Sequence, residues 1–163
     1  MRRELLDHSL RVGISFGVTS GIITTLGLLV GLSAGTSSRP AVLGGIVTIA
    51  VADSLSDALG IHISEESEGV HTQREVWTAT VATFVTKFLT ALTFAIPVGL
   101  LDLDAAVVVS VVWGACALTL LSWNLARRQG VKPRPLVAEH LGVATLVVFA
   151  AHLVGLGISA LSS

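Results

Sequence analysis

Five long apolar stretches constrain the fold of this chain more than any other feature of its sequence. They cover residues 12–34, 41–63, 77–101, 105–125 and 136–161. A helix needs about 20 apolar residues to cross the hydrocarbon core of a bilayer. The stretches are continuously apolar rather than alternating, which is not the pattern of membrane strands. We therefore expect an all-α integral membrane protein with about five transmembrane helices, in which residues 1–163 form a single transmembrane domain.

Composition supports this interpretation. The 163 residues are 52% hydrophobic and 13% charged, a balance that a soluble domain of this size could not bury. The expected partner is therefore the lipid bilayer, and the expected location is the cell (inner or plasma) membrane. The first apolar stretch is longer than the core of a signal peptide, about 7 to 15 residues, so we interpret it as a retained helix.

Several classes of function have little support. The formal net charge of -1 argues against a nucleic-acid partner. The sequence has no glycine loop for nucleotides, no HExxH, no paired CxxC and no nucleophile with an evident base, so we do not expect an enzyme. Its single cysteine, Cys116, provides neither a disulfide framework nor a thiolate cluster within one chain.

The basic residues predict the orientation of the chain. On one side of the expected membrane lie Arg2, Arg3, Arg11, Arg74, Arg127, Arg128, Lys132 and Arg134. The connections on the other side hold Arg39 and the acidic Asp102 and Asp104. The positive-inside rule then places the N-terminus in the cytoplasm and the C-terminus outside. Lys87 belongs to neither side, because it lies within the third apolar stretch.

Charged residues inside the apolar stretches are the first candidates for function, because each costs at least a few kcal/mol in a membrane. Asp53 and Asp57 are four residues apart, so both carboxylates share one helical face, which Gly60, Ser64 and Glu68 continue towards the cytoplasm. This face resembles an ion path.

Two interpretations of the aspartates remain open. Carboxylate oxygens are the ligands that hard divalent cations prefer, so Asp53 and Asp57 are candidate metal ligands. Alternatively, one of them pairs with Lys87 in a buried ion pair that only fixes helix positions. Two carboxylates and one ammonium leave one negative charge, which favours a bound cation or a transferable proton.

Further candidate ligands and proton carriers lie nearby in the sequence or in the last stretch. Glu65, Glu68 and His62 complete the predicted metal set, with the two glutamates in an acidic cytoplasmic connector over residues 64–75. This connector could concentrate cations or could be an ordinary solvated loop. His152 is a candidate proton relay, and either histidine could instead be a hydrogen-bonded packing residue.

Small residues at intervals of three and four mark one face of the first stretch. They are Gly13, Gly17, Gly21, Thr24, Gly27, Gly31 and Gly35. Such a stripe lets a neighbouring helix approach closely, so we expect it to serve packing first. A polar pathway along it is the alternative.

Three segments carry a resemblance to a known family. The run FGVTSGIITTLGLLVG (residues 16–31), followed by ADSLSDALG (52–60) and SEESE (64–68), resembles the vacuolar iron transporter family, and the order of the segments is also similar. Pro97 near the end of the third stretch is similar too. The resemblance covers most of the chain and is strongest over residues 13–68.

The resemblance implies a fold and a function. It implies five membrane-spanning helices in a homodimer that exports ferrous iron or manganese from the cytosol in exchange for protons, with the path between protomers. Ser20 and Thr24 of the first helix would then line the path beside Asp53, Asp57, Lys87, Gly60 and Ser64. The ion would be the substrate, and no permanently bound cofactor is expected.

The chain also departs from the family pattern. Ser20 stands where the family has an aspartate, Asp57 where it has a methionine, and Ile61-His62 where it has Glu-Tyr. A carboxylate in place of a thioether predicts a harder site that is less selective for iron. The large cytoplasmic metal-binding domain of longer members is absent, as in short prokaryotic relatives. Two alternatives remain: a proton- or sodium-coupled carrier of another solute, and a non-transporting structural membrane protein.

Overall fold

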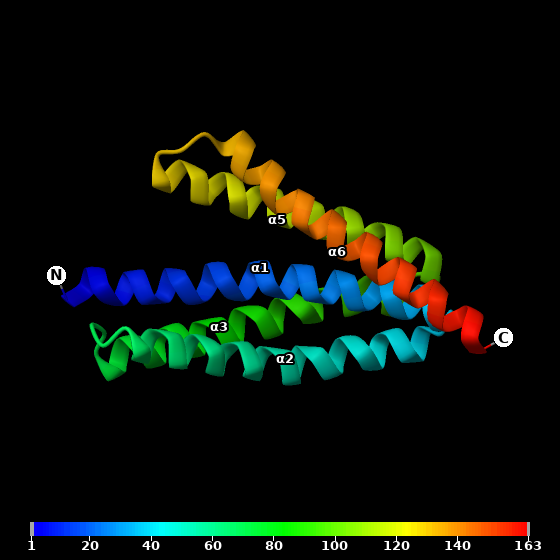
Figure 1. Ribbon diagram of the computed structural model, residues 1–163, viewed down its shortest axis with the longest axis horizontal. Helices are drawn as coiled ribbons and strands as arrows, with labels where there is room; N and C mark the ends of the chain where they lie inside the picture. Colours follow the sequence, from blue (N-terminus) through cyan, green and yellow to red (C-terminus); the bar gives the residue numbers. More distant parts are fainter. Residues whose placement is uncertain (1, 163) are drawn as a thin grey trace. The chain divides into compact units, whose positions relative to one another are not determined.

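The structure is a computed structural model that describes residues 2–162, and it is helical throughout, without strands in that range (Figure 1). The helices are α1 (Arg2–Thr36), α2 (Arg39–Ser67), α3 (Gln73–Thr93), α4 (Ala95–Leu100), α5 (Leu103–Gln129) and α6 (Pro133–Ser162). Five segments are long and apolar enough to cross a membrane: Leu6–Thr36, Arg39–Ser67, Gln73–Leu100, Leu103–Gln129 and Pro133–Leu161. The predicted all-α class is confirmed, as is the number of helices able to span a membrane, whereas membrane insertion and the orientation of the termini stay predictions.

Four of the five helices extend at both ends beyond the apolar stretches that predicted them, and the third begins earlier, at Gln73, but ends at Leu100. For example, α2 starts at Arg39 and ends at Ser67, whereas its apolar stretch covers residues 41–63. The polar N-terminal segment continues α1 back to Arg2 instead of forming a separate element. Helical hydrogen bonds form whether a residue faces lipid or water, so hydropathy marks the apolar middle of a helix and not its ends. The predicted connector 64–75 is correspondingly shorter, since only residues 68–72 lie outside helices.

The short connection between α1 and α2 is closed by serines. Ser37 adopts a left-handed backbone conformation with φ of 48° at the end of α1. The Ser38 hydroxyl accepts a hydrogen bond of 3.4 Å from the Ala41 backbone N–H, which helps to satisfy the first turn of α2. Pro40 follows in that turn, where its missing N–H costs no hydrogen bond.

The third apolar segment is interrupted near Pro97. The helix α3 ends at Thr93 and α4 begins at Ala95, so Phe94 separates them. Proline at position 97 has no N–H to donate to the Thr93 carbonyl, and its ring collides with that carbonyl in a regular helix. The interruption therefore follows directly from the proline.

The described chain divides into two compact units. The first unit contains residues 2–21 and Val47–Thr93, and the second contains Ile22–Ile46 and residues 94–162. The first unit thus holds the N-terminal part of α1, most of α2 and all of α3. The second holds the rest of α1, the start of α2, and α4 to α6. Whether both act as one transmembrane domain stays a prediction.

In the first unit, α1 lies directly against the backbone of α3. A Cβ atom built on Gly13 would be 2.8 Å from Ala82 Cβ, and one built on Gly17 would be 2.7 Å from the Thr83 carbonyl oxygen. Real Cβ atoms do not approach other atoms so closely. The first glycines of the stripe therefore serve packing, as expected.

In the second unit, the later glycines of the stripe face α6. A Cβ on Gly31 would be 3.3 Å from the Ala151 carbonyl oxygen, and one on Gly35 would be 3.3 Å from that of Gly155. The buried positions of α5 recur every fourth residue, which is the spacing of one helical face: Ala106, Ser110, Gly114, Leu118, Ser122 and Ala126. Apart from Leu118, the buried residues of α5 are small, which lets neighbouring helices approach this face closely.

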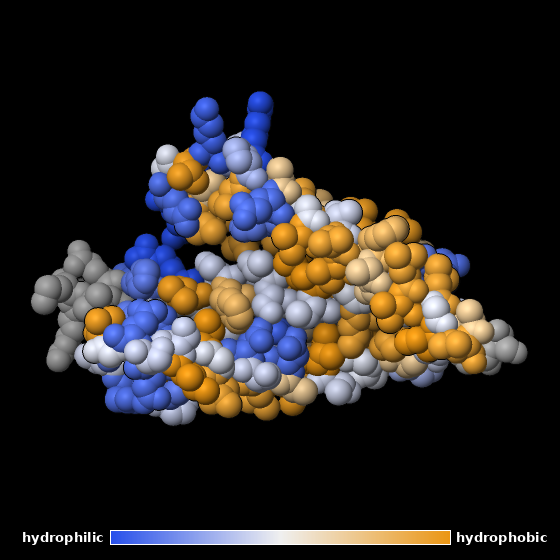
Figure 2. All heavy atoms as spheres, in the orientation of Figure 1, coloured by the Kyte–Doolittle hydropathy of each residue, from blue (hydrophilic) through white to orange (hydrophobic). Residues whose placement is uncertain are grey.

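The outward surface of α6 is strongly apolar. Only 11% of its most apolar window is buried within the structure. Leu146 and Val154, for example, are 66% and 62% exposed. Figure 2 shows hydrophobic side chains over much of the visible part of this helix. In water such a surface would be unstable, and in a bilayer it contacts lipid chains.

Candidate functional site

The candidate site of the first unit is a lysine held between two aspartates, and we call it the Lys87 cluster. It consists of Ser20 on α1, Asp53 and Asp57 on α2, and Lys87 on α3. Lys87 Nζ is 2.5 Å from Asp53 Oδ2 and also contacts Asp57 Oδ2. It lies 2.9 Å from Ser20 Oγ, and the Ser20 hydroxyl donates to Asp57 Oδ2 over 2.7 Å. The lysine therefore pairs with both aspartates.

Burial within the Lys87 cluster is uneven. The Lys87 side chain is 2% exposed, whereas the side chains of Asp53 and Asp57 are 33% and 23% exposed. Figure 2 shows a hydrophilic patch near the middle of α2, with hydrophobic atoms next to it. The ammonium group is thus enclosed, while the outer edges of both carboxylates stay accessible to an approaching cation.

Close contact between α1 and α3 holds Lys87 in place. A Cβ on Gly17 would be 3.1 Å from Lys87 N, and a Cβ on Gly21 would be 3.2 Å from the Lys87 carbonyl oxygen. Because these glycines lack side chains, the backbone of α1 lies against the backbone at Lys87, and Ser20 between them reaches the ammonium group. The glycine stripe therefore also builds the site.

The charges in the cluster do not cancel. Two ionised carboxylates and one ammonium leave a net charge of -1 in the middle of a helix that is long and apolar enough to span a membrane. In a bilayer an uncompensated charge there is costly, which favours a second cation or a proton. The arrangement can chemically bind a cation or exchange a proton.

His62 lies towards the end of α2 and is engaged elsewhere. Its Nδ1 is 3.0 Å from Thr80 Oγ1, and its ring contacts Trp77 edge-on with the centroids 4.8 Å apart. The Thr80 hydroxyl donates its own hydrogen to the Val76 carbonyl oxygen, so His62 Nδ1–H is the donor in this pair. The observed contacts are those of a packing residue at a helix contact.

The acidic connector folds around His71. Its Nε2 is 3.6 Å from Glu65 Oε2 and 3.3 Å from Glu68 Oε2. Glu65 is buried, with 7% of its surface exposed, whereas Glu68 is exposed. Glu75 accepts a hydrogen bond of 2.8 Å from the Thr72 N–H and so closes the start of α3. The connector is thus ordered by its own contacts and is not only a solvated loop.

The other predicted path residues are separate from the Lys87 cluster. Gly60 and Ser64 lie on the exposed face of α2 in the first unit. Thr24 is half-buried and His152 is exposed on α6, and both belong to the second unit. Their roles in a path or a proton relay stay predictions.

The predicted metal ligands do not form one cluster. Among the side chains that the structure describes, residues 6–161, no three of His, Cys, Asp or Glu come together in a way that could hold a metal ion. Within the predicted set, Asp53 and Asp57 meet around Lys87, and Glu65 and Glu68 meet around His71. Any metal bound there would need further ligands, such as water or groups from a second chain.

The sequence did not reveal which histidines pair with hydroxyls. Ser122 on α5 lies 2.7 Å from His140 Nδ1 on α6, and the Ser122 hydroxyl donates to the Leu118 carbonyl oxygen. His140 therefore donates to Ser122. The only available signal was the recurrence of small residues every four positions on α5, which includes Ser122 but gives no partner.

Comparisons with known proteins give no match: no family model, no curated protein and no solved structure matches this chain. The resemblance to the vacuolar iron transporter family therefore stays a prediction, and the functional argument depends on the Lys87 cluster itself.

Proposed function

We propose that this protein is a membrane carrier that moves a divalent metal ion of the Fe²⁺ or Mn²⁺ type out of the cytoplasm in exchange for protons. The single observation behind the proposal is the enclosed Lys87 ammonium bridging Asp53 and Asp57. Ionisable groups at such a depth are characteristic of substrate and proton paths. When no metal ion is bound, the Lys87 ammonium is the cation that neutralises part of the charge of the two carboxylates.

Charge balance explains why the exchange involves a proton. With Lys87 protonated, the cluster carries -1, and a divalent cation would bring it to +1. If Lys87 instead gives up one proton as the metal binds, the cluster becomes neutral. A neutral cluster costs least in a low-dielectric environment, so metal entry and proton release favour each other. Rebinding of a proton to Lys87 then favours metal release.

The accessible edges of the carboxylates provide the binding position. A hard divalent cation takes about six oxygen ligands, more than Asp53 and Asp57 supply. Ser20 Oγ, which already touches Asp57, is a third oxygen. Water and a second copy of the chain would supply the rest.

A homodimer is supported by the face of α2 beside the cluster. Its exposed residues recur every fourth position and are all small: Gly44, Thr48, Ala52, Ser56, Gly60 and Ser64. Side chains of this size allow a second helix to approach closely. Two copies meeting there would bring the accessible edges of their aspartates near the shared interface.

The test is flux of Fe²⁺, Mn²⁺, Co²⁺ and Zn²⁺ into proteoliposomes, with and without a pH gradient. We expect flux that the pH gradient drives and that Asp57→Asn reduces at least about 100-fold, as for loss of a charged ligand. Asp104→Asn is the matched control, because Asp104 is an exposed carboxylate at the start of α5. His152→Ala in the same assay tests the proton relay.

The cluster charge of -1 also favours a second candidate. A single monovalent cation would neutralise the cluster while Lys87 stays protonated, as in a sodium- or proton-coupled carrier of another solute. Sodium-driven or metal-independent proton flux that requires Asp57 would identify that carrier. If the folded protein moves no ion at all, both transport proposals fail and the cluster is a structural ion pair.

A further inference from the structure

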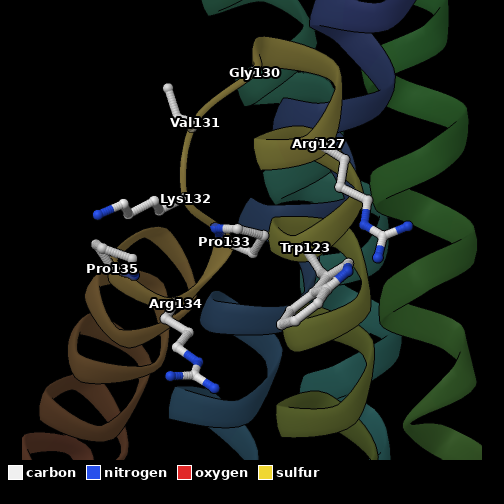
Figure 3. Close-up of a pocket in the computed structure, with 8 residues that line it drawn as sticks. All are labelled: Trp123, Arg127, Gly130, Val131, Lys132, Pro133, Arg134 and Pro135. Atoms are coloured by element: carbon white, nitrogen blue, oxygen red, sulfur yellow. The ribbon is translucent and has the colours of Figure 1, made fainter.

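A second polar feature lies at the turn between α5 and α6, away from the Lys87 cluster in sequence. A cavity of about 640 Å³ opens there, and Figure 3 shows the residues that line it: Trp123, Arg127, Gly130, Val131, Lys132, Pro133, Arg134 and Pro135. The first two come from the last turns of α5 and the last three from the start of α6. All of them belong to the second unit.

Positive charge dominates this cavity. Arg127, Lys132 and Arg134 line it, and Arg128 lies beside it in sequence. The chain has no acidic residue between Asp104 and Glu139. None of the four cations makes an ion pair within the described residues 2–162. All four side chains are exposed, so their positive charge is available to an anion from outside the chain.

The turn itself is stiff. Gly130 ends α5 in the left-handed conformation with φ of 69°, and the Val131 N–H bonds back to the Ala126 carbonyl oxygen over 3.0 Å. This is the hydrogen-bond pattern of a Schellman cap. Pro133 and Pro135 restrict the chain that follows. The backbone that carries the lining cations is therefore restricted before binding, so little conformational entropy is lost when a ligand binds.

Trp123 indicates the depth of the cavity. Trp123 is 41% exposed, and the Arg127 guanidinium lies 5.7 Å from the centroid of its ring. Tryptophan is enriched where the hydrocarbon core meets the headgroups. The cavity lies where two helices able to span a membrane end, so in a bilayer that both helices cross it would lie at the level of the lipid phosphates.

We propose that this cavity binds the headgroup of an anionic phospholipid. Arg127, which lies beside Trp123, would donate paired N–H groups to the phosphate oxygens, and Lys132 and Arg134 would add positive charge around it. The Trp123 ring would contact the glycerol backbone below it. Basic pockets between membrane helices are suited to such headgroups. This inference does not depend on transport or on the Lys87 cluster.

The test uses Trp123 as the reporter. In a Trp77→Phe, Trp113→Phe protein, Trp123 is the only tryptophan, and lipids with brominated chains quench its fluorescence on contact. The vesicles consist of phosphatidylcholine. We expect brominated phosphatidylglycerol to quench as strongly as an at least about fivefold higher mole fraction of brominated phosphatidylcholine. The loss of one lining cation should reduce this preference about fivefold.

Matched variants separate a pocket from general surface charge. Arg127→Gln removes a lining cation, whereas Arg128→Gln removes an equal charge from a side chain that bonds to Asn124 Oδ1 and does not line the cavity. We expect the first variant to lose the preference and the second to change it less than about twofold. Arg127→Lys, which keeps the charge, should recover part of it.

Three outcomes would overturn the proposal. They are equal quenching by the two lipids, equal losses in Arg127→Gln and Arg128→Gln, and displacement of the brominated phosphatidylglycerol by excess inorganic phosphate. The last would indicate a site for a free anion. If the two tryptophan substitutions prevent folding, native mass spectrometry of the wild-type protein with phosphatidylglycerol and phosphatidylcholine decides between the same outcomes.

Discussion

The two units use α1 in different ways. In the first unit, Gly17 and Gly21 bring α1 against the backbone of Lys87, whose ammonium group contacts Asp57. In the second unit, Gly31 and Gly35 bring α1 against α6, and the neighbouring residues are Ala151 and Gly155. One pattern of small residues therefore supports a polar site in one unit and plain helix packing in the other. What distinguishes them is the residue opposite the glycines.

Lys87→Met removes the charged group that distinguishes the first unit, and we expect it to have the largest effect on stability and flux. Removing the ammonium leaves two carboxylates four residues apart without their shared cation. Breaking a buried ion pair costs about 3–5 kcal/mol, and the accessible edges of the aspartates reduce this to about 2–4 kcal/mol. We also expect the proposed flux to fall to background. Unfolding by dodecyl sulfate in detergent micelles measures the first effect, and proteoliposome flux measures the second.

The control for this variant removes the carboxylates as well. Lys87→Met combined with Asp53→Asn and Asp57→Asn leaves no unpaired charge, so we expect stability to return to within about 1 kcal/mol of wild type. Flux should stay absent. A triple variant as unstable as Lys87→Met would show that the loss came from packing of the lysine stem and not from charge.

The Lys87 cluster shows how far the sequence can predict a site. Helical spacing placed Asp53 and Asp57 on one face, and the cost of a buried charge identified Lys87 as a possible partner. The sequence could not show that the lysine touches both aspartates, because that depends on how closely α1 and α3 approach. Ser20 was named only through a family resemblance, and its hydroxyl bridges the ammonium and Asp57.

Gly17→Ala and Gly31→Ala compare the α1 contacts of the two units, and we expect a smaller loss of stability from them than from Lys87→Met. Alanine improves helix propensity by about 1 kcal/mol at either site. At Gly17 the new Cβ would be 2.7 Å from the Thr83 carbonyl oxygen, so Gly17→Ala should cost about 1–3 kcal/mol in total. At Gly31 the closest atom is 3.3 Å away, so Gly31→Ala should stay within about 1 kcal/mol of wild type.

Flux provides a second measurement for this pair. Because Gly17 positions the backbone of Lys87, Gly17→Ala should also reduce the proposed flux, whereas Gly31→Ala should retain it. Equal effects of the two substitutions on stability would mean that the contact of α1 is equally tight in both units. The contrast drawn from the glycines would then be wrong.

The fold itself was more predictable than the site. Five spans follow from hydropathy, and the interruption before α4 follows from Pro97. The ends of the helices did not follow, since polar residues such as Arg39 and Ser67 continue the helices past their apolar stretches. The Schellman cap at Gly130 and the cavity beside it depend on backbone geometry, for which the sequence showed only Gly130, Pro133 and Pro135.

Ser20→Ala should have a smaller effect than Lys87→Met or Gly17→Ala. It removes the hydroxyl that accepts from Lys87 and donates to Asp57, at a cost of about 1 kcal/mol. Thr25→Val in the second unit is the control, because the buried Thr25 hydroxyl has no hydrogen-bond partner among the described residues. We expect that variant to be neutral or slightly stabilising in the same unfolding assay. If Thr25→Val loses more stability than Ser20→Ala, the polar contact that matters more for stability lies in the second unit and not in the first.

The smallest expected difference lies within α5. Ser122 and Ser110 are both fully buried, and they lie on the same helical face three turns apart. Ser122 accepts from His140 Nδ1–H, whereas Ser110 Oγ has no hydrogen-bond partner in the described chain. Hydrogen bonds between membrane helices contribute about 0.6 kcal/mol on average. Ser122→Ala should therefore lower the free energy of unfolding by about 0.6–1.5 kcal/mol, since it also leaves the His140 N–H unpaired.

Ser110→Ala removes a hydroxyl that is buried without a bond, so it should leave the free energy of unfolding unchanged or raise it slightly. The sign of the difference between the two serines is thus more informative than its size. If Ser110→Ala is the more damaging change, its hydroxyl has a partner in the membrane, such as a second chain, and the second unit also contains a polar contact that matters. If Ser122→Ala is the more damaging, the bond between Ser122 and His140 stabilises the packing of α5 against α6, and the Ser110 hydroxyl makes no contact that matters for stability.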